Sequence, residues 1–89
     1  MISAREYVSM FKKFTTYTKY AIKYYAKYLV TKKESYKRDF NYYLKLSKDL
    51  HANLLANLEI FKENEKLYNL LNELLKKMKE DLEVIEKAI

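Results

Sequence analysis

The sequence of 89 residues contains no glycine, proline, cysteine or tryptophan. Without glycine, it cannot form a phosphate-binding P-loop or a dinucleotide fingerprint, because both need a backbone without Cβ close to the ligand. Without cysteine, it has no disulfide, no thiolate nucleophile and no cysteine-based zinc site. These absences exclude several classes of enzyme and metalloprotein and leave the redox compartment open.

Long apolar runs are also missing, since no uninterrupted run exceeds three residues. A bilayer span needs about 20. The first six residues lack the apolar segment of a signal peptide. We therefore expect a cytoplasmic protein, or one in the host cytoplasm or virion if it is viral, and we do not expect a membrane to be its partner.

Apolar residues recur at helical spacing along almost the whole chain, which predicts an all-α fold. Breaks between helices are expected at polar clusters. Ser3 with Glu6 and Thr31 with Glu34 have capping-box spacing, and Asn64 can cap a third helix. We predict helices at about 3–31, 35–62 and 65–88 in one domain, 1–89, forming a three-helix antiparallel bundle.

An alternative keeps residues 35–89 as one helix, because apolar residues hold an approximate heptad register across Asn64. The fold is then a helical hairpin with one very long second helix, completed by oligomerisation. Asn57 and Asn64 occupy core-like positions of this register, where we favour a polar edge or a helix break.

Charge is distributed unevenly, although the chain as a whole has a net charge of +6. Residues 1–38 carry ten Lys or Arg residues against Glu6 and Glu34, a net charge of +8, and residues 39–89 have a net charge of −2. Nine of the ten tyrosines precede Leu44. A basic, tyrosine-rich front half thus joins a leucine-rich and nearly neutral back half.

Placed on a helical wheel at about 100° per residue, the first helix separates into three faces. Its apolar stripe comprises Tyr7, Met10, Phe11, Phe14, Thr18, Ala21, Ile22, Tyr25, Tyr28 and Leu29. A basic lane about 80° wide lies opposite and comprises Arg5, Lys12, Lys19, Lys23 and Lys27. Between them lie Tyr17, Tyr20 and Tyr24 with Lys13, and the turn that follows adds Lys32, Lys33, Lys37 and Arg38.

The lane contains no glutamate, whereas a solvated helix usually mixes charges of both signs. Its lysines repel one another, which favours a polyanionic partner. Lysine can neutralise phosphates, and tyrosine can stack on bases or hydrogen-bond to phosphates. We expect Tyr17, Tyr20, Tyr24 and Tyr42 to be available for contact, and Tyr7, Tyr25, Tyr28, Tyr36 and Tyr43 to face the core.

With two arginines and no glutamine, the chain has few side chains that read bases. We therefore predict nucleic-acid binding through the phosphate backbone with little sequence specificity. Residues with AT-rich codons make up about half of the chain, which favours a viral or mobile-element nucleoprotein. In size, helicity and charge the chain resembles small viral nucleoproteins and helical subunits of CRISPR complexes, and no motif identifies a family.

No catalytic constellation is evident, and we expect neither an enzyme nor a cofactor or metal. His51 is the single histidine, so zinc-protease and di-iron patterns are absent. The alternative function is a protein-interaction module: an adaptor, an inhibitor, an immunity-type protein or a small subunit of a nucleoprotein complex such as a CRISPR effector. Its basic face would then dock an acidic protein surface. In either case we expect a homo-oligomer or a subunit of a larger assembly.

Overall fold

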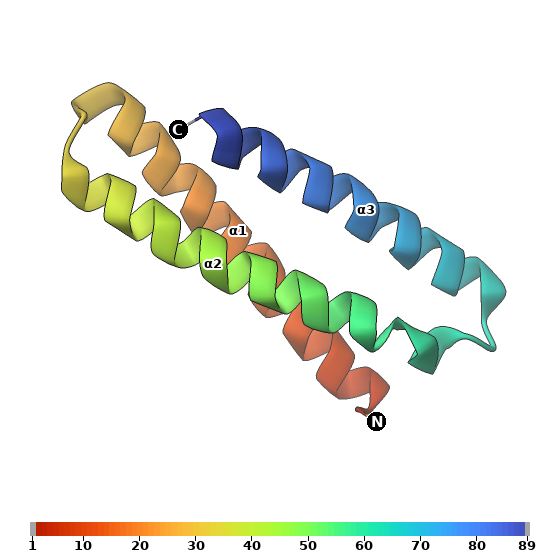
Figure 1. Cartoon of the computed structure of the whole chain (residues 1–89). Helices are drawn as coiled ribbons and strands as arrows, with labels where there is room; N and C mark the ends of the chain where they lie inside the picture. The colour runs from red at the N-terminus through yellow and green to blue at the C-terminus, as the bar shows by residue number, and fades with distance from the viewer. Residues whose placement is uncertain (1, 89) are drawn as a thin grey trace.

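The computed structural model describes residues 2–88, and in this part of the chain it contains helices and no strand. The elements are α1 (Ala4–Thr31), α2 (Glu34–Ala56), a short 3₁₀ helix η1 (Leu58–Phe61) and α3 (Glu65–Ala88). α1 and α2 form an antiparallel hairpin, and α3 runs back along it (Figure 1). The elongated molecule measures 48 × 20 × 14 Å. The predicted all-α three-helix bundle is confirmed.

The start of α1 has the predicted capping box. The Ser3 hydroxyl accepts a hydrogen bond from the backbone N–H of Glu6 at 3.1 Å. The carboxylate of Glu6 accepts in return from the backbone N–H of Ser3 at 3.4 Å. This reciprocal pair satisfies amide groups that the first turn of a helix leaves without partners.

The turn between α1 and α2 is made without glycine. Lys32 adopts the left-handed conformation, with φ 58° and ψ 20°, and its N–H bonds to the carbonyl of Tyr28. The capping box predicted for Thr31 and Glu34 is wrong. α1 continues through Thr31, whose hydroxyl donates to the carbonyl of Lys27 at 2.8 Å. Lys33 therefore occupies the N-cap of α2, without a side-chain hydrogen bond.

α2 ends at Ala56, so the prediction that it extends to residue 62 is wrong. The side-chain amide of Asn57 donates to the carbonyl of Asn53 at 2.8 Å and competes with continuation of the helix. The Tyr7 hydroxyl donates to the carbonyl of Leu54 at 2.9 Å and satisfies a second terminal carbonyl. The tighter η1 then places Phe61 edge-on to Tyr7, with ring centroids 5.0 Å apart.

Asn64 caps α3 as predicted, its side-chain oxygen accepting from the N–H of Leu67 at 3.1 Å. The chain reverses direction between η1 and α3 (Figure 1). The alternative of one continuous helix over residues 35–89 is therefore wrong. Both asparagines of the heptad register, Asn57 and Asn64, lie at helix ends.

All three helices and η1 contribute to one core. Its buried apolar side chains are Tyr7, Phe14, Ala21, Phe40, Leu44, Leu54, Leu58, Leu75 and Leu82. His51 is also buried, and its Nε2–H donates to the carbonyl of Leu75 at 2.7 Å, joining α2 to α3. No helix in the described residues is both long and apolar enough to cross a membrane.

The apolar stripe predicted for α1 is buried only in part. Tyr7, Phe14 and Ala21 are inside, but Ile22 is 47% exposed and Leu29 is 44% exposed. On the helical wheel of α1 both fall within about 60° of Tyr7, on the same side as Val8 and Phe11, which line a groove against α3. α3 ends short of the turn end of the hairpin (Figure 1).

Candidate nucleic-acid interface

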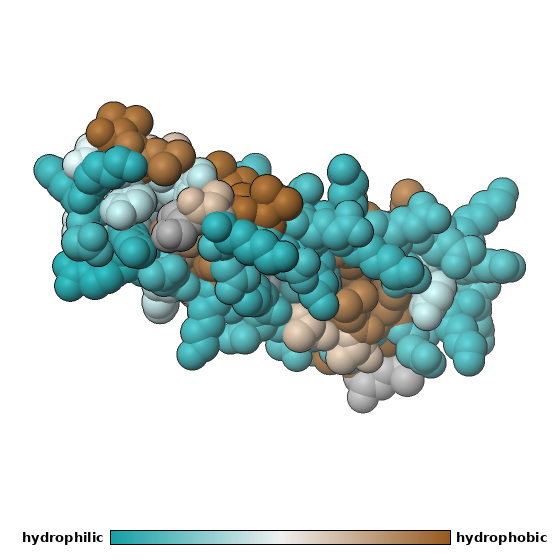
Figure 2. All heavy atoms as spheres, turned by 45° about the horizontal axis from the view of Figure 1, so that its top comes forward, coloured by the Kyte–Doolittle hydropathy of each residue, from teal (hydrophilic) through white to brown (hydrophobic). Residues whose placement is uncertain are grey.

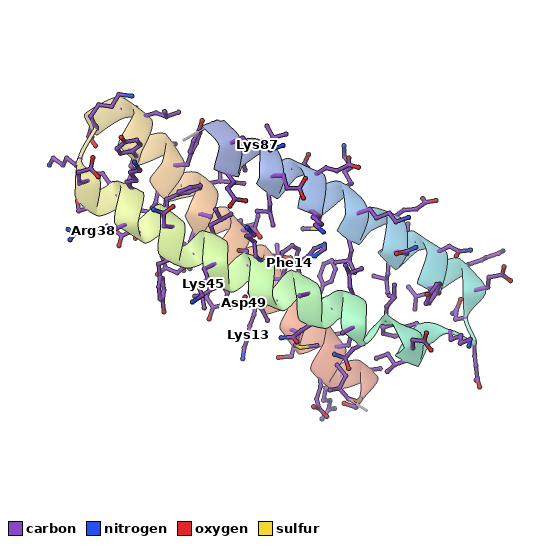
Figure 3. The ribbon with its side chains drawn as sticks, in the orientation of Figure 1. Lys13, Phe14, Arg38, Lys45, Asp49 and Lys87 are labelled. Atoms are coloured by element: carbon purple, nitrogen blue, oxygen red, sulfur yellow. The ribbon has the colours of Figure 1, made fainter. Side chains whose placement is uncertain are left out.

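The basic lane of α1 is fully on the surface. Arg5, Lys12, Lys19, Lys23 and Lys27 are all exposed. Arg5 and Lys27 are 22 positions apart on one helix, which is about 33 Å at 1.5 Å per residue. The neighbouring Lys13 points away from the bundle, while Phe14, next in sequence, points in between the helices (Figure 3).

None of the lane residues has an acidic partner within residues 2–88. The ion pair in this part of the chain joins Lys48 of α2 to Glu86 of α3 at 3.0 Å, on another face. The only carboxylate of α1, that of Glu6, is engaged in the capping box. The positive charge of the lane is therefore balanced by solvent ions alone, and a polyanion can replace them.

The residues predicted around the turn cluster at one end of the hairpin. Lys32, Lys33 and Arg38 are exposed, and Lys37 is half-buried. The ammonium groups of Lys32 and Lys37 lie 5.6 Å and 5.8 Å from the ring centroid of Tyr28. The thirteen predicted residues thus form no single pocket. They extend along α1 and around its C-terminal end.

The predicted ridge of Tyr17, Tyr20 and Tyr24 packs against α2. All three rings surround Tyr43, with centroids 6.0, 5.2 and 5.6 Å away. With Tyr36 and Tyr42 these residues make up what we call the tyrosine cluster. Tyr24 and Tyr43 are nearly parallel, at an interplanar angle of 5°.

Two lysines of the lane border this cluster. The ammonium groups of Lys23 and Lys27 each lie 5.6 Å from the ring centroid of Tyr24. Lys27 is also 5.4 Å from the ring of Tyr36. Cations and aromatic faces attract each other at such distances, so the lane and the cluster form one continuous surface.

The tyrosine cluster and α3 lie on opposite flanks of the α1–α2 hairpin. On α2, Lys48, Ala52 and Leu55 line a pocket against α3. On the helical wheel of α2, Tyr36 and Tyr43 fall on the other side of Phe40 and Leu44. One seam of the hairpin is therefore covered by α3, and the other is filled by tyrosine rings.

Burial and neighbouring groups change the acidity of Tyr43, the central residue of the tyrosine cluster. Burial is the largest cause that raises the pKa of Tyr43, and the charges of Tyr24, Tyr42, Tyr20 and Asp39 raise it further. Burial also raises the pKa of Tyr7, whose hydroxyl is in the core. Both side chains therefore stay neutral and can act as hydrogen-bond donors beyond the usual range of tyrosine.

A second surface feature is an apolar groove between α1, η1 and α3. It has a volume of about 460 Å³ and is lined by Tyr7, Val8, Phe11, Lys12, Phe61, Leu67, Leu71 and Leu74. Lys12, which belongs to the basic lane, is the charged residue at its rim. Figure 2 shows apolar patches among largely hydrophilic surface, at the turn end and toward the opposite end.

The described residues hold no cluster of His, Asp and Glu suited to a metal ion. Comparison with protein-family models, curated proteins and solved structures found no match to this chain. Of the tyrosines expected to face the core, Tyr7 is buried and the others are half-buried: Tyr25, Tyr28, Tyr36 and Tyr43. Tyr25 and Tyr43 pack against the core, and Tyr36 and Tyr43 also belong to the cluster. Hydrophobic periodicity does not determine the rotation of α2 about its own axis closely enough to predict that Tyr36 and Tyr43 lie beside the tyrosine ridge of α1.

Proposed function

We propose that the protein binds nucleic acid through its phosphate backbone, with little sequence specificity. The binding surface is the basic lane of α1 extended by the turn residues. One observation carries the proposal: five exposed basic residues share one face of a 28-residue helix, and none is paired with an acid in the described chain. Same-sign neighbours on a helix reduce its stability, so the lane has a cost in the free protein that a polyanion removes.

The dimensions support this ligand. A lane about 33 Å long matches about one turn of duplex DNA, or a strand of similar contour. Lysine binds phosphate as a point charge and does not require a fixed geometry. A lysine-rich surface with two arginines and no glutamine in the whole chain is suited to backbone contact and poorly suited to base readout.

The test is fluorescence anisotropy with labelled duplex and single strands and two quadruple variants. One variant combines K12Q, K19Q, K23Q and K27Q in the lane. The matched control combines K66Q, K76Q, K77Q and K79Q on α3, which removes the same charge from exposed positions outside the lane. We expect the lane variant to lose more than about 100-fold in affinity at low salt, and the control less than about tenfold. Equal losses, or no binding by the wild type, would contradict the proposal.

The apolar groove favours a second candidate function, a protein-interaction module. Val8 and Leu74 in the groove are 49% and 40% exposed, and the adjoining rim is basic. This combination suits an amphipathic helix that carries apolar residues on one face and acidic residues beside them. Such a helix is one form of the acidic protein partner that the sequence leads us to expect.

A pair of synthetic helical peptides tests this second function. Both have the same leucine stripe, flanked by Glu in one and by Lys in the other. We expect NMR shift changes at Val8 and Leu74 with the acidic peptide only, and their loss in the L74K variant. No shift changes with either peptide would exclude it. Sedimentation of the protein alone shows whether a second copy occupies the groove instead.

A further inference from the structure

The tyrosine cluster offers two partly free aromatic rings, one on each side of the α1–α2 seam. Tyr20 of α1 is 40% exposed and Tyr42 of α2 is 60% exposed. Both contact Tyr43, with centroid distances of 5.2 and 5.1 Å. A partly exposed ring that is already held by a neighbouring ring loses little freedom when a ligand stacks on it.

The hydroxyl groups of the cluster are also free to bind. Within residues 2–88, the tyrosine hydroxyl that hydrogen-bonds to another residue is that of Tyr7 in the core. Those of Tyr20 and Tyr42 make no such bond in this part of the chain. They remain available as donors to phosphate or base oxygens.

Phosphate-binding groups stand beside these rings. Tyr20, Lys23, Tyr24 and Lys27 follow the i, i+3, i+4, i+7 pattern and so share one face of α1. The ammonium groups of Lys23 and Lys27 lie 5.6 Å from the Tyr24 ring. Aromatic surface for bases and positive charge for the backbone are therefore adjacent, as in proteins that bind single strands.

We propose that the protein prefers single-stranded nucleic acid, with bases stacked on Tyr20 and Tyr42 while Lys23 and Lys27 hold the adjoining phosphates. This rests on the proposed function and names its ligand class. In a duplex the faces of the bases are covered by their neighbours, so the two rings cannot stack on them. A single strand presents these faces without the cost of unstacking.

One acidic residue borders the cluster. Asp39 stands four residues before Tyr43 on α2, so the two side chains are neighbours on the helix, and its carboxylate contributes to the raised pKa of the Tyr43 hydroxyl. It is exposed on α2 and repels phosphate near the stacking site. The D39N variant should therefore bind single strands several-fold more tightly, a gain that binding at a distant site would not produce.

The main experiment compares three ligands of about 15 nucleotides: oligo(dT), a strand of the same length without bases, and a duplex. The wild type is compared with the double variant Y20L/Y42L, and with Y20F/Y42F, which keeps the rings. We expect the wild type to bind oligo(dT) at least tenfold more tightly than the abasic strand and the duplex. The leucine variant should lose this preference and keep its affinity for the duplex, and the phenylalanine variant should keep most of the preference.

The chain lacks tryptophan, so its emission comes from tyrosine and reports stacking directly. We expect oligo(dT) to quench this emission and the abasic strand to leave it nearly unchanged. Two results would overturn this inference alone. In the first, binding depends on the lane but shows no preference for oligo(dT). In the second, Y20L/Y42L keeps the preference and has a native circular dichroism spectrum. Absence of binding to all three ligands overturns the proposed function as well. Oligo(U) in place of oligo(dT) separates RNA from DNA as the source of the strand.

Discussion

Reversing one charge in the middle of the lane should make the protein more stable and a weaker binder. Lys23 stands four residues from both Lys19 and Lys27, and all three are exposed on α1. Like charges at this spacing cost about 0.2–0.5 kcal/mol per pair, and opposite charges stabilise by a similar amount. The K23E variant converts two repulsive pairs into two attractive ones, a gain of about 0.8–2 kcal/mol.

Part of this gain is offset by the lost contact between Lys23 and the Tyr24 ring, which at an exposed site contributes about 0.5–1 kcal/mol. We therefore expect K23E to raise the free energy of unfolding by about 0.5–1 kcal/mol. For a domain of this size the midpoint of thermal unfolding should rise by about 2–8 °C at low salt. High salt should remove the gain, because exposed charges are screened.

Lys77 offers a matched control for Lys23. It is exposed on α3, and Glu73 and Asp81 lie four residues before and after it. K77E changes the net charge by the same amount but converts two attractive pairs into repulsive ones, so it should lower the unfolding free energy by about 1 kcal/mol. Thermal unfolding and anisotropy of both variants test the reasoning. A K23E protein that is less stable than the wild type, or that binds nucleic acid as tightly, would refute it.

Three further predictions concern the fold. Y7F should lose about 1–2 kcal/mol in urea unfolding, because it leaves the carbonyl of Leu54 without its buried donor. Burial raises the pKa of Tyr7, so the folded state keeps a proton that the unfolded state loses near pH 10. Stability should thus fall as the pH rises above about 10, and less steeply in Y7F. K32G should gain about 0.5–1 kcal/mol by relieving the left-handed φ of 58°. K33G, where φ is −76°, should instead lose stability.

The regular part of the fold could be predicted from the sequence because local signals agreed with it. The capping box of Ser3 and the cap of Asn64 mark helix starts, and both form as expected. The end of α2 could not be predicted because it depends on tertiary contacts. The Tyr7 hydroxyl reaches the end of α2 across 47 residues of sequence. The left-handed Lys32 has no sequence signal at all, since such a position normally selects glycine.

In the candidate site, too, local spacing predicts one part, and the other part depends on how the helices pack. The lane follows from residue spacing on one helix, and the structure exposes all five of its members. The tyrosine cluster needs the rotation of α2 relative to α1, which periodicity alone does not determine. The spacing predicts that Tyr43 faces the core, and Tyr43 does pack against the core, but it is half-buried and also lies at the centre of the cluster. Likewise, the exposure of Ile22 and Leu29 could not be predicted from their spacing on α1, which places both in the apolar stripe.

The salt dependence of nucleic-acid binding measures how many phosphates the protein contacts. If all five lane residues contact phosphates, the logarithm of the affinity should fall against the logarithm of salt concentration with a slope at least as steep as about −4.5 for duplex DNA and about −3.5 for a single strand, and contacts by the turn residues should make it steeper. The variant with K12Q, K19Q, K23Q and K27Q loses four of these five contacts, so its duplex slope should be shallower than that of the wild type by about 3.6. A wild-type slope near zero, or a slope that the lane variant leaves unchanged, would contradict phosphate binding by this face of α1.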